Sequence, residues 1–324
     1  MKLRSILLTT LATFFCTASM SATNLYHTWV SASGSDSNPC TFTLPCASFN
    51  GALANTWSYG VISVKDTGDF GPVTIAQSVT IDGNSLGIIT STSETPAVTI
   101  NSSGLTVVIR NLTLNNPTMS GFGISINSSG SSVTVDHCLL DNFMFCGIIS
   151  NSVAYLTIEN SQILGFGAHG IEIASGGQNV VVKNTVLVGV LTKPQYGFLV
   201  DSVSGTVQAS LQGVTIQGPE TAAVQVSTGT TEISNSVITQ SATAVLANSG
   251  ATVSVESSML SQNTTAVCAN TGGKIRLEDN DIFDNGTGVA NCGGQVKTNS
   301  NNRDSGNTSG DPIPAADVSS TVLF

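Results

Sequence analysis

The sequence predicts an all-β fold in which short parallel strands stack coil upon coil into a solenoid. Three observations support this prediction. A triplet of an apolar residue, a polar residue and Asn or a substitute returns after every 19 to 29 residues. The segments between the triplets are short runs in which apolar and polar residues alternate, as they do along a pleated strand. A repeat this small cannot bury its own apolar side, so it must stack on its neighbours.

Three columns of residues should line the inside of the solenoid, because they stay apolar in every repeat. The first column, within the triplets, comprises Ile109, Val135, Ile158, Val182, Leu211, Ile233, Val255 and Leu277. The second comprises Leu114, Leu140, Ile163, Leu187, Ile216, Ile238, Leu260 and Ile282. The third follows a small corner residue and comprises Ile124, Ile148, Ile171, Phe198, Val224, Val245, Val267 and Val289. Equivalent residues of neighbouring coils should lie about 4.8 Å apart.

The last residue of each triplet should form a bend between the first two strands of a coil. Asn111, Asn160, Asn184 and Asn235 occupy this position, with His137 and Asp279 as substitutes. Asparagine tolerates the left-handed backbone conformation that a tight bend requires. Its side-chain amide can also donate to the coil on one side and accept from the coil on the other. We therefore expect a ladder of asparagine side chains along the bends.

The repeat and its asparagine column resemble those of right-handed parallel β-helix proteins, also called pectin-lyase-like proteins, over residues 61–302. The resemblance implies a right-handed single-stranded parallel β-helix, an architecture that carries many activities. The run WVSASGSDSNPCTFTLPCASFNGAL near the amino end, followed by DTGDFGPVTIAQSVTIDG, also resembles the opening of exported bacterial β-helix proteins. The function of that group is generally unassigned.

The two ends of the chain have different predicted roles. Residues 1–22 combine a basic start, a short apolar run and small residues, which is typical of a secretory signal peptide. Residues 23–60 should cap the amino end of the solenoid, with a helix over 47–57 that buries Phe49, Leu53 and Trp57. Residues 303–324 are predicted to form an irregular cap or tail. We expect a secreted, periplasmic or cell-surface protein without a membrane span.

Six cysteines follow the predicted signal peptide, and an even number in an exported chain favours disulfides. Local pairing is the simplest arrangement. The expected pairs are Cys40 with Cys46, Cys138 with Cys146, and Cys268 with Cys292. Their spacing relative to histidine does not match a zinc site, and we predict no metal ligands among them.

The charge of the chain restricts its partners. The formal net charge is −10, and only 9% of residues are charged. Such a protein repels phosphate backbones, so the sequence argues against nucleic acid as a partner. An acidic polysaccharide would be repelled as well unless Ca²⁺ bridged the carboxylates, and no other cofactor is expected.

A column of charged residues is the first candidate site. Arg110, Asp136, Glu159 and Lys183 follow one another in successive triplets and should point outward. Their arrangement resembles in kind that of pectate lyases, in which calcium screens a uronate and a basic side chain removes a proton. The alternative is that these residues are favourable cross-strand charge pairs with a structural role.

An aromatic and polar patch is the second candidate site. It comprises Phe122, Phe143, Phe145, Phe166, His169, Glu172, Lys193 and Tyr196. We predict that Phe122, Phe166, His169 and Tyr196 bind a ligand, because exposed aromatic faces stack on sugar rings. His169 and Glu172 could share a proton in catalysis. The segment 168–171 partly resembles the Gly-His-Gly segment of polygalacturonases, but the other parts of that signature are missing. The alternative is that the phenylalanines pack beneath loops.

A cluster of acidic residues is the third candidate. Glu278, Asp279, Asp281 and Asp284 lie close together in the sequence, but their spacing departs from that of a known calcium loop. A solvated acidic turn is the simpler interpretation.

The sequence leaves three functions open. The first is an exported recognition scaffold that binds carbohydrate on an outer sheet face. The second is a polysaccharide lyase or glycoside hydrolase, for which Arg110, Asp136, Glu159, Lys183, His169 and Glu172 are the weak catalytic candidates. The third is a structural or protein-binding surface protein. Nothing in the sequence indicates the oligomeric state.

Overall fold

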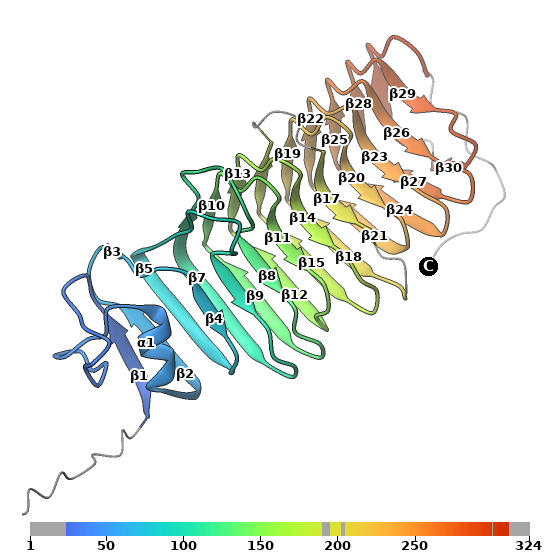
Figure 1. Ribbon diagram of the computed structural model, residues 1–324. Helices are drawn as coiled ribbons and strands as arrows, with labels where there is room; N and C mark the ends of the chain where they lie inside the picture. The colour runs from blue at the N-terminus through green and yellow to red at the C-terminus, as the bar shows by residue number, and fades with distance from the viewer. Residues whose placement is uncertain (1–23, 190–194, 202–204, 300, 311–324) are drawn as a thin grey trace, which may run out of the picture.

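A computed structural model describes residues 24–189, 195–201, 205–299 and 301–310. They form an elongated solenoid in which the chain advances coil by coil from the blue end to the red end in Figure 1. All strand pairings between named strands are parallel and join one coil to the next. The predicted signal peptide at residues 1–22 lies outside the described residues.

The strands form two sheets of 21 and 10 strands. The larger sheet contains β1 (Leu25–Val30), β2 (Thr56–Val64), β3 (Gly68–Asp69), β5 (Val79–Thr90), β7 (Thr106–Asn115), β9 (Ser132–Asp136), β10 (Leu139–Asp141), β12 (Tyr155–Glu159), β13 (Gln162–Leu164), β15 (Asn179–Lys183), β16 (Val186–Val188), β18 (Gln208–Gln212), β19 (Thr215–Gln217), β21 (Gly229–Ser234), β22 (Val237–Thr239), β24 (Ala251–Glu256), β25 (Met259–Ser261), β27 (Lys274–Glu278), β28 (Asp281–Phe283), β30 (Gln295–Thr298) and β31 (Arg303–Ser305). The smaller sheet contains β4 (Val73–Ile75), β6 (Val98–Ile100), β8 (Ile124–Ile126), β11 (Cys146–Ser150), β14 (His169–Ile173), β17 (Tyr196–Val200), β20 (Ala222–Val226), β23 (Thr243–Ala247), β26 (Thr265–Ala269) and β29 (Thr287–Ala290).

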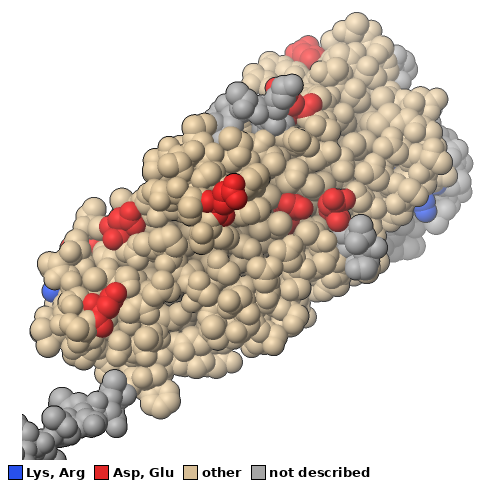
Figure 2. Space-filling model, in the orientation of Figure 1, with Lys and Arg blue, Asp and Glu red and all other residues tan. Residues whose placement is uncertain are grey.

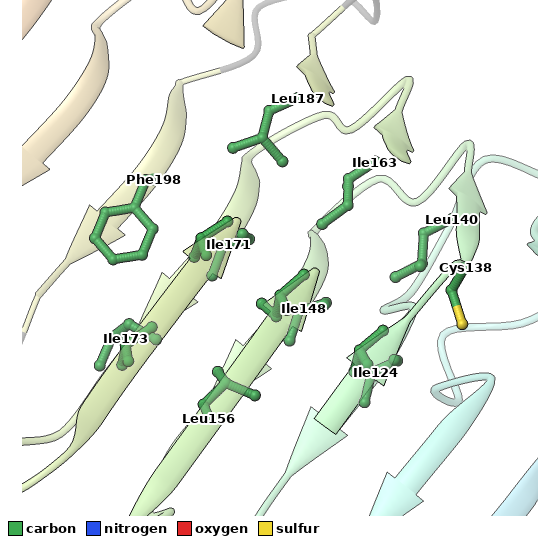
Figure 3. Packing of buried hydrophobic residues seen from close by; sticks show 14 of the residues in the cluster. Ile124, Cys138, Leu140, Ile148, Leu156, Ile163, Ile171, Ile173, Leu187 and Phe198 are labelled. Carbon is green, nitrogen blue, oxygen red and sulfur yellow. The ribbon is translucent and has the colours of Figure 1, made fainter. Parts of the chain in front are cut away.

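The three predicted inward columns are confirmed residue by residue. Ile158 pairs in register with Val135 on one side and with Val182 on the other, and the same relation holds along the whole first column. The second and third columns are equally continuous. Figure 3 shows side chains of the second column facing those of the third across the interior. The core is therefore one uninterrupted apolar stack.

The predicted bend column adopts the left-handed backbone conformation. The φ angles are 54° at Asn111, 50° at His137 and 51° at Asn160, and Ser257 and Asp279 have similar values. Each triplet thus ends in a sharp turn between two strands of the larger sheet. The expected side-chain ladder is only partly formed here: Asn184 Nδ2 donates to Asn160 Oδ1 at 3.3 Å, and Asn160 Nδ2 donates to Asp136 Oδ1 at 3.0 Å.

A second bend, which the sequence did not reveal, closes each coil after the second column. Its left-handed residues are Asn142, Gly165, Gly218, Gln240, Gln262, Asp284 and Gly306. The residue after each of them lies in one corner of the solenoid. In early coils this corner contains the fully buried rings of Phe143 and Phe166, whereas in later coils it contains buried Asn263 and Asn285.

Buried asparagines in the late coils form the ladder that we had expected at the first bend. Asn263 donates from its backbone N–H and from Nδ2 to Asn285 Oδ1, with both distances 3.0 Å. Asn285 donates in the same way to Asn307 Oδ1, with both distances 2.9 Å. A parallel ladder joins Asn280 to Asn302 just after the first bend. These amides satisfy backbone groups that the bends would otherwise leave unpaired inside the molecule.

The amino end contains one short helix, α1 (Phe49–Ala54), beside β1 and β2 at the blue end of Figure 1. Ser48 caps it by accepting from the Gly51 N–H. The helix is shorter than the predicted 47–57, because Trp57 belongs to β2 and is 58% exposed. That α1 shields the end of the solenoid stays a prediction. At the other end, regular structure continues past residue 302, since β31 pairs with β28.

Two of the three predicted disulfides are present. Cys40 and Cys46 are bonded with their Cα atoms 4.7 Å apart, and Cys268 and Cys292 are bonded with a Cα separation of 5.7 Å.

The third predicted disulfide, between Cys138 and Cys146, is wrong. Both cysteines are buried free thiols. Cys138 follows the first bend and points inward beside Leu140, as Figure 3 shows. Cys146 starts a strand of the other sheet, and its thiol donates to Glu172 on the outer face. The backbone of the coil therefore separates the two sulfur atoms. Burial raises the pKa of the Cys138 thiol to about 12, so this group stays protonated and unreactive.

The asparagine ladder should contribute measurably to stability. We expect Asn285→Ala to lower the free energy of unfolding by about 2 to 3 kcal/mol, because buried groups on Asn263 and Leu260 lose their partners. The exposed Asn179→Ala serves as the control and should change it by less than about 0.5 kcal/mol. Urea denaturation followed by circular dichroism measures both. Equal stability of the two variants would contradict a structural role for the ladder.

The cysteine assignments predict a specific alkylation pattern. Among the cysteines of residues 24–310, none should react with iodoacetamide in the native protein, and two should react after unfolding without reductant. Peptide mass spectrometry should locate the label at Cys138 and Cys146. A crosslinked peptide containing both residues would show that the expected third disulfide does form.

Candidate functional site

The charged column lies on the outer face of the larger sheet, as predicted. Arg110, Asp136, Glu159 and Lys183 are register neighbours on β7, β9, β12 and β15. Arg110, however, turns toward the preceding coil, and its Nε donates to Asp82 Oδ2 at 2.8 Å. It is therefore held away from Asp136 and Glu159.

Asp82 holds Arg110 through a well-satisfied carboxylate. Burial raises the pKa of Asp82, but hydrogen bonds from Asn111, the Asn84 N–H and Arg110 outweigh this effect and leave the pKa below its usual value. The carboxylate stays ionised and keeps the arginine in place. At its amino end, the charged column therefore has a structural role, because Arg110 joins two neighbouring coils through Asp82.

The two central carboxylates of the column have different surroundings. Asp136 Oδ1 lies 2.6 Å from His137 Nδ1 and also accepts from Asn160. Neither Glu159 nor Lys183 forms an ion pair with another residue in the described part of the chain. The column thus brings the four predicted residues side by side. Neither Arg110 nor Lys183, however, forms an ion pair with Asp136 or Glu159.

The aromatic residues of the second candidate form a row along the edge of the smaller sheet. We define the aromatic row as Phe122, Phe145, His169 and Tyr196. The rings of Phe122 and Phe145 have centroids 5.1 Å apart, and those of His169 and Tyr196 are 5.3 Å apart. Backbone hydrogen bonds between successive turns set this spacing, since the His169 N–H donates to Phe145 O at 2.8 Å. The row crosses four consecutive coils.

The centre of the aromatic row contains three titratable side chains. Cys146 and His169 are register partners on β11 and β14, and Glu172 lies three residues after His169 on β14. The Cys146 thiol donates to Glu172 Oε2 at 3.1 Å, and His169 Nε2 lies 4.0 Å from the same oxygen. His169 Nδ1 is buried without a hydrogen-bond partner among the described residues.

The environment keeps the histidine and the thiol neutral. Burial lowers the pKa of His169, although the charge of Glu172 opposes this effect. Burial, reinforced by Glu172, raises the pKa of the Cys146 thiol. A neutral imidazole can accept a proton or a hydrogen bond, whereas a neutral, buried thiol is a poor nucleophile.

Two expectations about the aromatic patch need correction. Phe166 was expected on the outer surface, but its side chain is fully buried because it follows the second bend at Gly165 and turns into the corner. Phe143 is buried in the same way. Lys193 lies outside the described residues. Phe145, in contrast, is 38% exposed and belongs to the row.

A shallow groove runs along the first bend in later coils, at a position that was not predicted from the sequence. Its volume is about 390 Å³, and it is open to solvent along its length. Its lining comprises Asn235, Ser236, Val237, Ser257, Ser258, Met259, Asp279, Asp281 and Arg303. The sequence repeat could have revealed this groove, because residues 22 positions apart lie side by side and the lining positions are mostly polar in successive coils.

The acidic residues of the third candidate do not form one cluster: Asp279 and Asp281 line this groove, and Glu278 and Asp284 do not. Asp281 is engaged by Arg303, whose Nε lies 2.6 Å from Oδ1. Asp284 occupies the second bend instead. In the residues placed by the structure, no group of three acidic, histidine or cysteine side chains is arranged to hold a metal ion. Likewise, none of the helices placed there is long and apolar enough to cross a membrane.

Several solved structures resemble this chain at low sequence identity. A GH136 lacto-N-biosidase from Eubacterium ramulus is 10% identical, with a TM-score of 0.59 over 87% of this chain and 67% of its own. The pectate lyase Pel9A is 15% identical, with a TM-score of 0.47 over 92% of this chain and 82% of its own. The Dettilon tailspike protein is 10% identical, with a TM-score of 0.48 over 75% and 59%. At these identities the likeness concerns the fold alone.

Comparison at the level of sequence gives the family. No curated protein matches the chain. The model of the right-handed β-helix region matches residues 60–208 and 196–311, which together cover most of the chain and include every predicted inward column. The chain therefore belongs to the right-handed β-helix family.

Proposed function

We propose that the protein binds carbohydrate along the aromatic row on the outer edge of the smaller sheet. The observation that carries the proposal is the alignment of two contacting ring pairs, Phe122 with Phe145 and His169 with Tyr196, over four consecutive coils, with the half-buried Glu172 beside them. The third function considered from the sequence, a purely structural surface, does not account for this alignment.

The spacing of the row suits a chain of sugar rings. Successive coils are about 4.8 Å apart, so each coil presents one ring to a ligand that runs along the solenoid. Phe145 is 38% exposed, and Phe122, His169 and Tyr196 are partly exposed. Such rings can stack on the apolar face of a sugar while their other sides pack on the protein.

Polar groups beside the rings can recognise sugar hydroxyls. Glu172 accepts hydrogen bonds, and neutral His169 has an unpartnered Nδ1. A ligand hydroxyl could satisfy this buried atom. The fold is also one on which a lacto-N-biosidase is built, which agrees with a sugar ligand without identifying it.

Catalysis is the second candidate function, and His169 is the residue that favours it. Its lowered pKa leaves an imidazole able to accept a proton near neutral pH. Arg110 is a weaker candidate, because Asp82 holds it. Incubation with uronate polymers and Ca²⁺ tests this alternative. Unsaturated products that absorb in the ultraviolet would show lyase activity, and the proposed function would then be catalysis. If none of a broad panel of polysaccharides is cleaved, the catalytic alternative is refuted.

Loss of one ring from the aromatic row should weaken glycan binding. On a glycan array, we expect Tyr196→Ala to reduce affinity for any bound glycan by about tenfold, because a stacking contact is lost. Tyr155→Ala is the matched control, since Tyr155 is 59% exposed on the larger sheet. Absence of any bound glycan, or equal effects of the two substitutions, would refute the proposal.

His169 should make stability depend on pH. Its folded pKa lies below the ordinary value of about 6.5, so the unfolded chain binds the proton more readily. Stability linked to His169 is therefore complete above pH 6.5 and declines as the pH falls through the interval down to the folded pKa. The melting temperature of His169→Gln should fall less between pH 7.5 and 5.5 than that of the unmodified protein. Identical falls would show that His169 titrates normally.

A further inference from the structure

We infer that the last coils carry a second site, which binds anionic oligosaccharides through Lys274, Arg276 and Lys297. We call these three residues the basic cluster. The inference takes its ligand class from the proposed carbohydrate function, but it uses none of the residues of the aromatic row.

The positive charges of the protein are unevenly distributed. Of the seven lysines and arginines in the described residues, Lys65, Arg110 and Lys183 are spread over the first two thirds of the chain. The other four, Lys274, Arg276, Lys297 and Arg303, lie between residues 274 and 303, near the carboxyl end of the described solenoid. On the face shown in Figure 2, acidic residues appear along most of the length and basic residues appear only near the two ends.

The basic cluster forms a flat triangle on the outer face of the larger sheet. Arg276 on β27 and Lys297 on β30 are direct register partners, about 4.8 Å apart between strands. Lys274 lies two residues before Arg276 on the same strand face, about 6.6 Å away. The intervening Ile275 is fully buried, so all three cations point outward and are exposed.

None of these three cations lies within ion-pair distance of a described carboxylate, and the nearest acidic neighbour along the strand is Glu278, two residues after Arg276 on the same face. Arg110 and Arg303 each pair with an aspartate, but Lys274, Arg276 and Lys297 form no ion pair with a described residue. Like charges placed directly opposite on neighbouring strands repel each other. A bound anion that lies between Arg276 and Lys297 would remove this repulsion and add charge-assisted hydrogen bonds.

The neighbours of the basic cluster indicate a short anionic sugar chain. Ser254 and Thr252 pair with Arg276 and Lys274 from the preceding coil, and Gln295 pairs with Lys274 from the following one. These hydroxyl and amide groups can bind sugar hydroxyls between the anionic groups. Glu278, on the same strand face as Arg276, and Glu256, the register partner of Glu278, flank the cluster on one side and limit its extent. A nucleic acid duplex would extend over these carboxylates, whereas a short oligosaccharide contacts only the cluster, so the repulsion that the net charge of −10 exerts on long polyanions is smaller for it.

Protection of the sheet edge is the competing explanation. Lysine on a terminal strand discourages pairing with other chains, and β30 pairs only with β27 among the described strands. This explanation accounts for Lys297 but not for Lys274 and Arg276, which belong to a strand paired on both sides.

Titration calorimetry with the purified protein tests the inference. The probes are oligogalacturonate, a sulfated dextran oligosaccharide and neutral dextran of equal length. We expect binding of at least one anionic probe and none of neutral dextran at this site, with affinity falling between 50 and 500 mM NaCl. The double variant Arg276→Gln/Lys297→Gln should weaken it by at least about tenfold. Comparison of the two anionic probes distinguishes carboxylates from sulfates.

Matched variants separate the outcomes. Lys65→Gln, at the other end of the solenoid, should bind as the unmodified protein does, and the charge-conserving Arg276→Lys/Lys297→Arg should retain binding. Tyr196→Ala should also retain binding of the anionic probe. The two proposals can therefore fail independently: loss of glycan binding at the aromatic row would not affect the basic cluster, and loss of anion binding at the basic cluster would not affect the aromatic row. Absence of anion binding, or unchanged affinity in the double variant, would overturn the inference. If the double variant aggregates but its monomer binds the anionic probe with unchanged affinity, Lys297 protects the sheet edge and the inference is likewise overturned.

Discussion

The whole structure depends on the register between one coil and the next. Residues such as Val135, Ile158 and Val182 are direct partners on neighbouring strands, and this relation repeats along three columns. A slip of one residue would turn every apolar side chain outward and every charge inward. The same register places Arg276 beside Lys297 and His169 beside Tyr196, so the sites are by-products of the packing rule that forms the core.

The inward columns and the first bend were predictable because each depends on a local property. Alternation decides which residues of a strand face inward, and asparagine marks a left-handed bend. The buried ladder was not predictable in the same way. Asn280 and Asn285 lie in the segment DNDIFDNG, for which the sequence indicates a solvated acidic turn. Their burial depends on partners 22 residues away and on a second bend formed by residues as different as Gly165, Gln262 and Asp284.

The candidate sites were harder to predict than the core. The structure aligns His169 and Tyr196, two of the predicted ligand-binding residues, because each stands directly before the small corner residue of its coil. The sequence did not show that Phe166 turns inward, since side-chain direction after a bend does not follow the strand period. It also did not show that Arg110 selects Asp82 over Asp136, because both are register neighbours and only side-chain geometry separates them.

The corner after the second bend changes its chemistry along the molecule. Early coils fill it with the rings of Phe143 and Phe166, and late coils fill it with the amides of Asn263 and Asn285. Contacts between apolar groups weaken on cooling, because their driving force near room temperature is mainly the entropy of water. Amide hydrogen bonds do not share that origin. At this corner, therefore, the contacts of the early coils are more sensitive to cold than those of the late coils, while the three apolar columns run through both halves.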